Sequence, residues 1–326
     1  MAGASGKIVL RIDHLSKEFP GVKALDDVSM EFREGEVHCL IGENGAGKST
    51  LIKAIAGYHA PTSGTITVHG KEYSEMTVPL AAECGIQVIY QEFNNVPPLT
   101  AAENVFLGVR TNPGLFVDFE GRRKAAKELF QRLGVELDPD QIVGTMSPAQ
   151  MQIVEIAKSV SKNAKILIMD EPTSSLTAKE IEELFRIIRQ LKADGCGIVY
   201  ISHRLEELKA IVDRVTIMRD GQYITDGNFA DMTMDQIIAN MVGREIKGHY
   251  YRVDNDGYSD EVVLKAGCIT TMESLLCFDL ELHKQEILGI GGLSDCGMHT
   301  LGRALYGLDE IVDGEVVLPK TGVKIK

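Results

Sequence analysis

The chain has 326 residues, about two domains at roughly 150 residues each, and is long enough for a sizeable core. Its 44% hydrophobic and 25% charged residues exclude wholesale disorder, collagen and a disulfide-rich miniprotein. The net charge of −13 argues against nucleic acid as a partner, because a binder would work against its own field. Neither a signal peptide nor an apolar run of about 18 residues is visible, so we expect an acidic, soluble, cytoplasmic-type protein.

The cysteines are scattered along the chain and form no CxxC pair. Such spacing is typical of reduced thiols and fits neither a disulfide framework nor a zinc site. The six residues are Cys39, Cys84, Cys196, Cys268, Cys277 and Cys296.

Taken in chain order, the elements predict an α/β class. Three early segments, 8–12, 28–32 and 64–70, indicate antiparallel strands beside a main sheet. Continuous apolar runs rich in β-branched residues predict buried parallel strands at 37–42, 86–91, 165–171 and 197–203. Helical patterns lie between them, one of them opened by a Thr177–Glu180 capping box, and residues 214–225 predict a hairpin turning at Asp220-Gly221.

A phosphate-binding loop follows the strand at 37–42 and opens a helix. Residues 42–50 read GENGAGKST, which is the GxxxxGK[ST] spacing in its expected strand–loop–helix context. Glycines let backbone N–H groups curl around phosphates, and the helix N-terminus adds partial positive charge. We expect Lys48 to reach the β- and γ-phosphates and the Ser49 hydroxyl to bind Mg²⁺.

Two acids end the apolar strand at 165–171. Asp170 is predicted to hold Mg²⁺ beside the loop. Glu171, the next residue, is predicted to point the other way across the strand and to polarise an attacking water. An ordinary strand end before Pro172 is the alternative, which the phosphate loop makes less favoured.

Polar residues also close two other strands, Gln91 at 86–91 and His203 at 197–203. Because ligands bind at the carboxyl ends of parallel strands, both are candidates for the same site. Ser147, Pro148 and Gln150 begin a later helix as a capping box, and a second box joins Thr100 to Glu103. Whether Ser147 is only a cap or also meets a γ-phosphate stays open from local sequence alone.

The chain repeats itself at a constant offset of 250 residues, with 28–70 matching 278–320 without gaps. We expect a first domain over 1–247, a linker over 248–261, and the opening of a second domain over 262–326; two copies of equal length would need roughly 500 residues. The matched residues include Glu36 with Glu286, Gly42 with Gly292, Gly47 with Gly297, Thr50 with Thr300, Leu51 with Leu301, Ala54 with Ala304, Gly57 with Gly307 and Gly64 with Gly314.

The second copy of the loop lacks the residues expected to bind phosphate and Mg²⁺ in the first. Met298 stands where Lys48 stands, His299 replaces Ser49, and Asp295 replaces Gly45. A thioether cannot neutralise phosphate, and a carboxylate repels it. We interpret residues 292–300 as a structural remnant.

Together, these motifs resemble those of the ATP-binding subunits of ABC transporters, over essentially the whole chain. The likeness is greatest to the monosaccharide-import branch, which has two fused ATP-binding halves. The order is Walker A at 42–49, Q-loop at Gln91, signature at 146–150, Walker B at Asp170 and Glu171, D-loop at 174–177 and switch histidine at His203. Phrases that carry the likeness are EFPGVKALDDVS (18–29), IYQEFNNVPPLTAAENVFLG (89–108) and YISHRLEEL (200–208).

The resemblance implies a P-loop ABC ATPase fold: a RecA-like parallel sheet, an antiparallel β subdomain and a helical subdomain at about 92–160 that docks on the permease. It implies ATP and Mg²⁺ as cofactors, with Glu171, His203 and Gln91 catalytic and Ser49, Gln91 and Asp170 around the metal. The nucleotide contacts that it implies are Phe19, stacked on adenine, with Gly42, Asn44, Gly45, Ala46, Gly47, Lys48, Ser49, Thr50, Ser147 and Gln150.

The implied partners are integral membrane permease subunits, an extracytoplasmic solute-binding protein and a head-to-tail ABC partner, at the cytoplasmic face of the membrane.

The sequence departs from the family pattern at two places: the signature reads MSPAQ where LSGGQ is usual, and Thr177 replaces a frequent aspartate. The alternatives are a soluble tandem ABC protein acting on ribosomes, against which Met298 and the short acidic linker argue, and a non-catalytic regulator, against which Glu171 and His203 argue.

Overall fold

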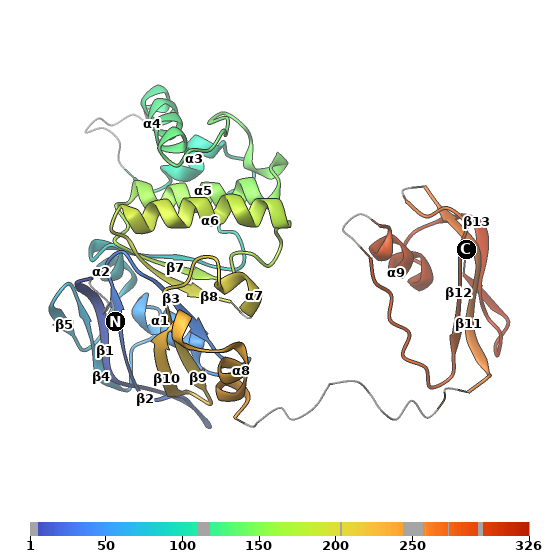
Figure 1. Cartoon of the computed structure of the whole chain (residues 1–326). Helices are drawn as coiled ribbons and strands as arrows, with labels where there is room; N and C mark the ends of the chain where they lie inside the picture. The colour runs from blue at the N-terminus through green and yellow to red at the C-terminus, as the bar shows by residue number, and fades with distance from the viewer. Residues whose placement is uncertain are drawn as a thin grey trace. The chain divides into compact units, whose positions relative to one another are not determined.

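Figure 1 shows the computed structural model of the chain, which describes residues 6–109, 118–202, 204–243, 257, 259–272, 274–292 and 296–325. The chain divides into two compact units, Met1–Ile246 and Lys247–Lys326. Within the described ranges, we find no helix with the length and apolar character needed to span a membrane.

The first unit is built on a six-stranded sheet in the order β10-β9-β3-β8-β7-β6. All neighbours are parallel except β10, which returns from β9 as an antiparallel hairpin. The turn at Asp220 and Gly221, both with positive φ, confirms the predicted hairpin. The strands are β3 (Val37–Ile41), β6 (Ile86–Ile89), β7 (Ile166–Asp170), β8 (Gly197–Ile201), β9 (Arg214–Arg219) and β10 (Gln222–Asn228).

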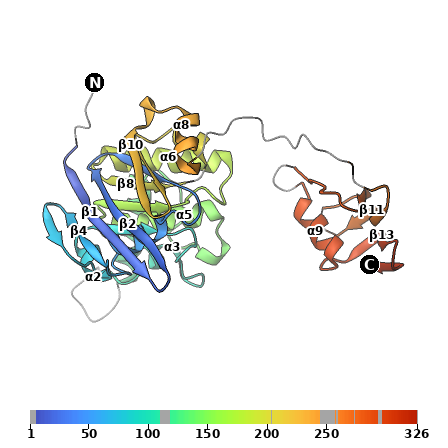
Figure 2. The same cartoon turned by 90° about the horizontal axis from the view of Figure 1, so that it is seen from below.

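An antiparallel sheet in the order β2-β1-β4-β5 forms a second layer, and the view from below shows β1, β2 and β4 side by side (Figure 2). Its strands are β1 (Ile8–Phe19), β2 (Val22–Arg33), β4 (Ser63–Val68) and β5 (Lys71–Tyr73). The predicted antiparallel strands are therefore confirmed, although β1 and β2 extend well beyond the predicted ranges.

Helices lie on both sides of the parallel sheet. Those of the first unit are α1 (Lys48–Ile55), α2 (Val78–Glu83), α3 (Ala101–Val105), α4 (Phe119–Arg132), α5 (Pro148–Ser161), α6 (Ala178–Ala193), α7 (Leu205–Leu208) and α8 (Met234–Val242), with single 3₁₀ turns η1 (Val143–Thr145) and η2 (Phe229–Asp231). The predicted capping boxes at Thr100, Ser147 and Thr177 open α3, α5 and α6. Figure 1 shows α3 and α4 gathered at the end farthest from the antiparallel sheet.

Two hydrophobic cores cover the two faces of the parallel sheet, because successive side chains of a strand point to opposite faces. Leu167 and Met169 of β7 face the core formed with α5 and α6, whereas Ile166 and Ile168 face the core formed with the antiparallel sheet and α1. The sheet is therefore buried on both sides, as its continuous apolar runs predict.

The second unit holds a four-stranded antiparallel sheet in the order β12-β11-β13-β14 and one described helix, α9 (Met298–Tyr306). Its small core is centred on Ala266, Ile269, Leu301 and Val316. The strands are β11 (Val262–Thr271), β12 (Phe278–His283), β13 (Ile311–Leu318) and β14 (Val323–Ile325).

Both units contain the same β-bulge between their first two strands. In the first unit the bulge holds His14 and Asp27, both at positive φ, with His14 Nδ1 2.8 Å from Asp27 Oδ1. In the second unit the corresponding residues, also at positive φ, are Cys268 and Cys277. The structural repeat therefore reaches backbone detail that the sequence match at 278–320 does not contain.

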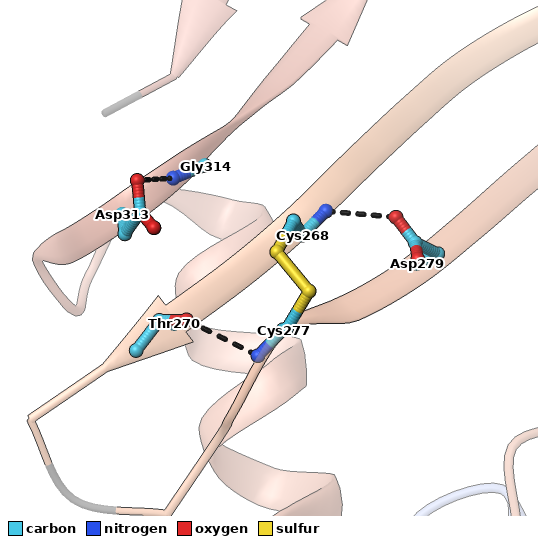
Figure 3. Close-up of a disulfide and its surroundings, with 6 residues drawn as sticks. All are labelled: Cys268, Thr270, Cys277, Asp279, Asp313 and Gly314. Atoms are coloured by element: carbon cyan, nitrogen blue, oxygen red, sulfur yellow. Dashed lines mark hydrogen bonds between the residues drawn. A yellow bond between two sulfur atoms is a disulfide. The ribbon is translucent and has the colours of Figure 1, made fainter.

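The expectation that all cysteines are reduced is wrong for this pair. Cys268 and Cys277 form a disulfide with an S–S distance of 2.01 Å and a Cα–Cα distance of 3.8 Å (Figure 3). The Cys268 N–H donates to Asp279 Oδ1, and the Cys277 N–H donates to Thr270 Oγ1. The two cysteines are nine residues apart in sequence and meet only because the bulged hairpin of β11 and β12 brings them into cross-strand contact. The spacing alone therefore did not reveal the pair.

The two copies differ at the strand that leads into the loop. In the first unit β3 lies between β8 and β9. The corresponding residues 287–291 form no strand, and the described part of the second unit contains no strand beside them. Ile287 is 83% exposed as a result.

Candidate functional site

The phosphate loop connects the buried end of β3 to the first turn of α1. Gly47 is the N-cap residue of α1 at φ 96°, a conformation that glycine adopts without steric cost. A Cβ at this position would lie 2.6 Å from the Ala24 carbonyl oxygen, so the residue also has to be small. Asn44 and Gly45, at the tip of the loop, are exposed, while Ala46 is buried beneath it.

Lys48 lies over the loop that precedes it. Its Nζ donates hydrogen bonds to the carbonyl oxygens of Gly42 at 2.8 Å and Glu43 at 3.0 Å. Burial lowers the pKa of Lys48, and the negative charges of Asp170 and Glu171 oppose that shift. The lysine is therefore within the electrostatic reach of both acids, as the sequence predicts for a common site.

The turn of the β9–β10 hairpin supports the loop from below. The Gly221 N–H donates to the Ala46 carbonyl oxygen at 3.2 Å, and the Asp26 N–H donates to the Gly221 carbonyl oxygen at 2.8 Å. Sequence reasoning identified this turn but missed its contact with the loop. Only the strand order, which places β9 beside β3, could have indicated it.

Asp170 is the last residue of β7, and its carboxylate interacts electrostatically with Lys48. Burial, and next the charge of Glu171, raise the pKa of Asp170, while Lys48 and Lys53 oppose the shift. Glu171 does not continue the strand alternation that we predicted, because β7 ends at Asp170 and Glu171 has a left-handed backbone with φ 47°. Its N–H is held by the Ile201 carbonyl oxygen at 3.0 Å.

The residues present fit a magnesium ion. Mg²⁺ prefers hard oxygen ligands and usually keeps several waters, so one carboxylate and one hydroxyl suffice on the protein side. Asp170 is a partly buried carboxylate whose charge is incompletely compensated, and Ser49 is an exposed hydroxyl in the first turn of α1. The described residues contain no cluster of three or more His, Cys, Asp and Glu that could hold a metal, so we find no competing site there.

Phe19 offers a partly exposed aromatic ring at the end of β1. The ring is 37% exposed and contacts His59 edge-on at a centroid distance of 5.4 Å. Lys17 Nζ lies 5.1 Å from the ring centroid and also donates to the Ala60 carbonyl oxygen. The exposed part of such a ring can stack on a planar base; His59, which fixes the ring from the side, was missed from sequence.

Gln91 is exposed two residues beyond β6, at the start of a loop that is fixed farther along. Asn95 Nδ2 donates to the Met151 carbonyl oxygen at 3.1 Å. Asn104, fully buried, accepts from the Val96 N–H at 2.7 Å and donates to the carbonyl oxygens of Val96 and Thr100. These asparagines anchor the loop that carries Gln91, and sequence reasoning missed both.

Ser147 and Gln150 form the predicted capping box of α5. The Gln150 N–H donates to Ser147 Oγ, and the Ser147 N–H donates to Gln150 Oε1 at 3.0 Å. The helix-cap interpretation is thus confirmed. These contacts do not bring either residue to the phosphate loop, so a γ-phosphate contact stays a prediction.

His203 lies outside the described residues. Next to it, Arg204 donates to the carbonyl oxygens of Thr173 and Ser174, at 3.3 and 3.4 Å. This arginine joins the segment after β8 to residues 174–177, where Thr177 caps α6. Sequence reasoning missed Arg204, although it follows the predicted histidine directly.

The helix that follows the second loop begins like α1 but without a lysine. Gly297 caps α9 at φ 86°, as Gly47 caps α1, and Met298 occupies the first position of the helix. Asp295 lies outside the described residues.

Comparisons with known proteins agree with this geometry. The family described as ABC transporter matches residues 25–174. The chain is 46% identical over 318 residues to a putative ribose/galactose/methyl galactoside import ATP-binding protein of Agrobacterium fabrum, covering 97% of this chain and 63% of that protein. It is 44% identical over 317 residues to the galactose/methyl galactoside import ATP-binding protein of Escherichia coli, covering 62% of that protein. The chain thus spans less than two thirds of the length of these relatives.

Solved structures match about two thirds to three quarters of the chain. A nucleotide-free ATP-binding cassette from an ABC transporter has a TM-score of 0.63 and 28% identity, covering 73% of this chain and 96% of that one. A cassette bound to ADP and phosphate, solved as a dimer, has a TM-score of 0.59 and 26% identity, covering 67% and 98%.

Proposed function

Because the chain belongs to the ABC transporter family of ATP-binding proteins, we propose that it binds and hydrolyses ATP to energise import of a monosaccharide or similar small solute. One observation carries the proposal: Lys48 is held over a glycine-rich loop at a helix N-terminus, within electrostatic reach of Asp170 and Glu171 at the carboxyl end of β7, in the same parallel sheet. The names of the relatives support the sugar as cargo.

Different residues of the chain would bind the phosphates, activate the attacking water and hold the metal. Backbone N–H groups of residues 42–50 and the N-terminus of α1 hold the phosphates, and Lys48 neutralises β/γ-phosphate charge. Glu171 accepts the proton of the attacking water as general base. Ser49, Gln91 and Asp170 would hold Mg²⁺, which supplies further neutralisation of phosphate charge when bound.

Other residues are assigned by their place in the fold. We propose that Phe19 stacks on adenine and that His203 contacts the γ-phosphate. Ser147 and Gln150 begin α5, whose N-terminal dipole would meet the γ-phosphate of a head-to-tail ABC partner.

The remaining partners follow from the import function. We propose integral membrane permease subunits, a solute-binding protein on the outer side, and a location at the cytoplasmic face of the membrane. The residues 262–326 would form the N-terminal part of a second, degenerate ABC domain, with 248–261 as linker. The bulge shared by the two units supports this assignment.

The test is the variant Glu171→Gln in the full-length protein with its membrane subunits. It keeps the shape of the side chain but removes the base, so turnover is expected to fall by at least about 10²-fold while nucleotide affinity is retained. Single-turnover phosphate release and fluorescent-nucleotide titration measure the two quantities. Unchanged turnover would remove Glu171 from the mechanism, and absence of nucleotide binding by the unmodified protein would refute the proposal.

A further inference from the structure

Arg204 contacts the segment that follows Glu171. Its guanidinium donates hydrogen bonds to the carbonyl oxygens of Thr173 at 3.3 Å and Ser174 at 3.4 Å. Thr173 is 1% exposed, so one of the two acceptors belongs to a residue packed inside the first unit. The Arg204 N–H donates to Ser202 Oγ at 3.0 Å, which holds the main chain of the arginine to the residue directly after β8.

Arg204 caps α7 and is oriented in turn by an acid of that helix. Glu207 accepts at Oε1 a hydrogen bond from Arg204 Nη1 at 3.0 Å. Because a guanidinium presents its N–H groups in a rigid planar fork, one orientation of the arginine serves Glu207 and both carbonyl oxygens. A lysine at this position would offer donors from a single nitrogen, so it would not reproduce all three contacts.

The contacted segment continues from Glu171, whose backbone needs support. Its φ of 47° lies in the left-handed region, which a residue other than glycine keeps only where its surroundings hold it. The Ser174 N–H donates to the Glu171 carbonyl oxygen at 3.3 Å, which is long for a hydrogen bond of this type. Arg204 adds two donors to this turn from outside it, and these donors carry its positive charge.

Glu171 is therefore connected to the end of β8 on both sides of its own position in the chain. Its N–H donates to the Ile201 carbonyl oxygen at 3.0 Å, which fixes the peptide that precedes the side chain. Arg204 holds the residues at 173–174, which fixes the chain that follows. Loss of the arginine would leave the first connection and release the second.

We propose that Arg204 is a positioning residue for Glu171. It acts through the segment at 173–174 and fixes the direction in which the Glu171 carboxylate points, without a contact of its own to the nucleotide. Misplacing a reacting group by about 1 Å costs up to about 10²-fold in rate, whereas nucleotide affinity depends mainly on the phosphate loop. The inference rests on the proposed function, because it presupposes Glu171 as general base.

The first test is the split between kcat and KM for ATP hydrolysis, measured on the full-length protein with its membrane subunits. Arg204→Ala is expected to lower kcat by about tenfold and to leave KM and the Kd for nucleotide within about twofold. Arg204→Lys keeps the charge but loses the fork, so it should recover only part of kcat. An unchanged kcat in Arg204→Ala would overturn the inference.

Arg189→Ala is the matched control for this test. Arg189 Nη2 donates from α6 to the Ala210 carbonyl oxygen at 3.3 Å, a contact of the same kind and length that does not involve residues 171–174. We expect this variant to keep kcat within about twofold of the unmodified protein. An equal loss of kcat in Arg189→Ala and Arg204→Ala would overturn the inference, because any arginine–carbonyl contact of the unit would then have the same effect.

A double-mutant cycle tests whether the arginine acts through Glu171. Once Glu171→Gln has removed the base, Arg204→Ala has no base left to misplace, so it should change the residual single-turnover rate by less than about twofold. Glu207→Gln should show the same dependence with a smaller effect. A tenfold loss from Arg204→Ala in both backgrounds would overturn the inference, because the arginine would then act independently of Glu171.

The outcomes separate the two proposals. If Glu171→Gln lowers turnover as expected and Arg204→Ala has no effect on the unmodified protein, the inference about Arg204 fails and the proposed function stands. If Glu171→Gln leaves turnover unchanged, the assignment of the base fails and the inference fails with it.

Discussion

Three charged side chains set the electrostatics of the proposed nucleotide site: Lys48, Asp170 and Glu171. Burial lowers the pKa of Lys48 and raises that of Asp170, so both shifts disfavour the charged forms on which binding depends. Without ligands, the burial of these charges lowers the free energy of unfolding of the protein. Binding of an anion at Lys48 and of a cation at Asp170 would offset this loss.

Asp170→Asn tests this at a single residue. The folded-state pKa of Asp170 is raised, so the stabilisation from this residue is complete below its unfolded pKa and is lost as the pH rises through the folded value. We therefore expect the variant to have a higher free energy of unfolding than the unmodified protein at pH 7 without Mg²⁺, with a difference that shrinks toward pH 4.

Urea denaturation at several pH values measures this difference, and Asp220→Asn, at an exposed turn, serves as control. Addition of Mg²⁺ and nucleotide should stabilise the unmodified protein more than the variant. A variant less stable than the unmodified protein at pH 7 would contradict the assigned direction of the pKa shift.

At the scale of elements, the phosphate loop depends on a turn far away in sequence. Gly221 has φ 77°, its N–H supports Ala46, and a Cβ there would lie 2.9 Å from the Ala24 carbonyl oxygen. Gly70 has a similar φ of 84° but no atom within 4 Å of the Cβ position. The two glycines differ mainly in how close the nearest backbone atom lies to the Cβ position.

Gly221→Ala is therefore expected to cost more than Gly70→Ala. The left-handed conformation alone costs about 1–2 kcal/mol for alanine, which is the effect expected at Gly70. At Gly221 the contact adds about 1–3 kcal/mol and displaces the loop, so nucleotide affinity should fall several-fold. Chemical denaturation and nucleotide titration measure both; equal effects of the two substitutions would show that the turn does not support the loop.

Elements with local signals were predicted from sequence, and contacts between distant elements were not. Ser147 with Gln150 and Thr177 with Glu180 are capping boxes because residues three apart meet at a helix start. The support of Ala46 by Gly221 and the anchoring of the loop by Asn104 need the folded arrangement. Asp170 and Lys48 could be predicted to lie together because the carboxyl ends of parallel strands meet at one edge of the sheet.

At the scale of the whole molecule, the two units have separate cores and close the same bulge with different chemistry. The first uses His14 and Asp27, and the second uses the Cys268–Cys277 disulfide. The covalent bond restricts the unfolded chain of the second unit.

Replacing both cysteines by serine is expected to lower the free energy of unfolding of the second unit by about 2–3 kcal/mol. Cys268→His with Cys277→Asp, which copies the first unit, should recover part of the loss, and Cys296→Ser is the control at a free thiol. Calorimetry measures the transition of the second unit; an unchanged transition in the double serine variant would contradict a stabilising role of the disulfide.

The two loops should also differ in occupancy, giving one nucleotide per chain. Lys48 supplies the charge in the first loop, and a lysine–phosphate pair at about 4 Å is worth about 1–4 kcal/mol per unit charge. Met298 supplies none in the second loop, although Gly297 reproduces the helix cap. Calorimetric titration with a non-hydrolysable ATP analogue is therefore expected to give one site. Lys48→Ala should weaken it at least about tenfold, whereas Met298→Ala should change neither affinity nor stoichiometry. Two sites, or loss of binding in Met298→Ala, would show that the second loop has kept its function despite losing its lysine.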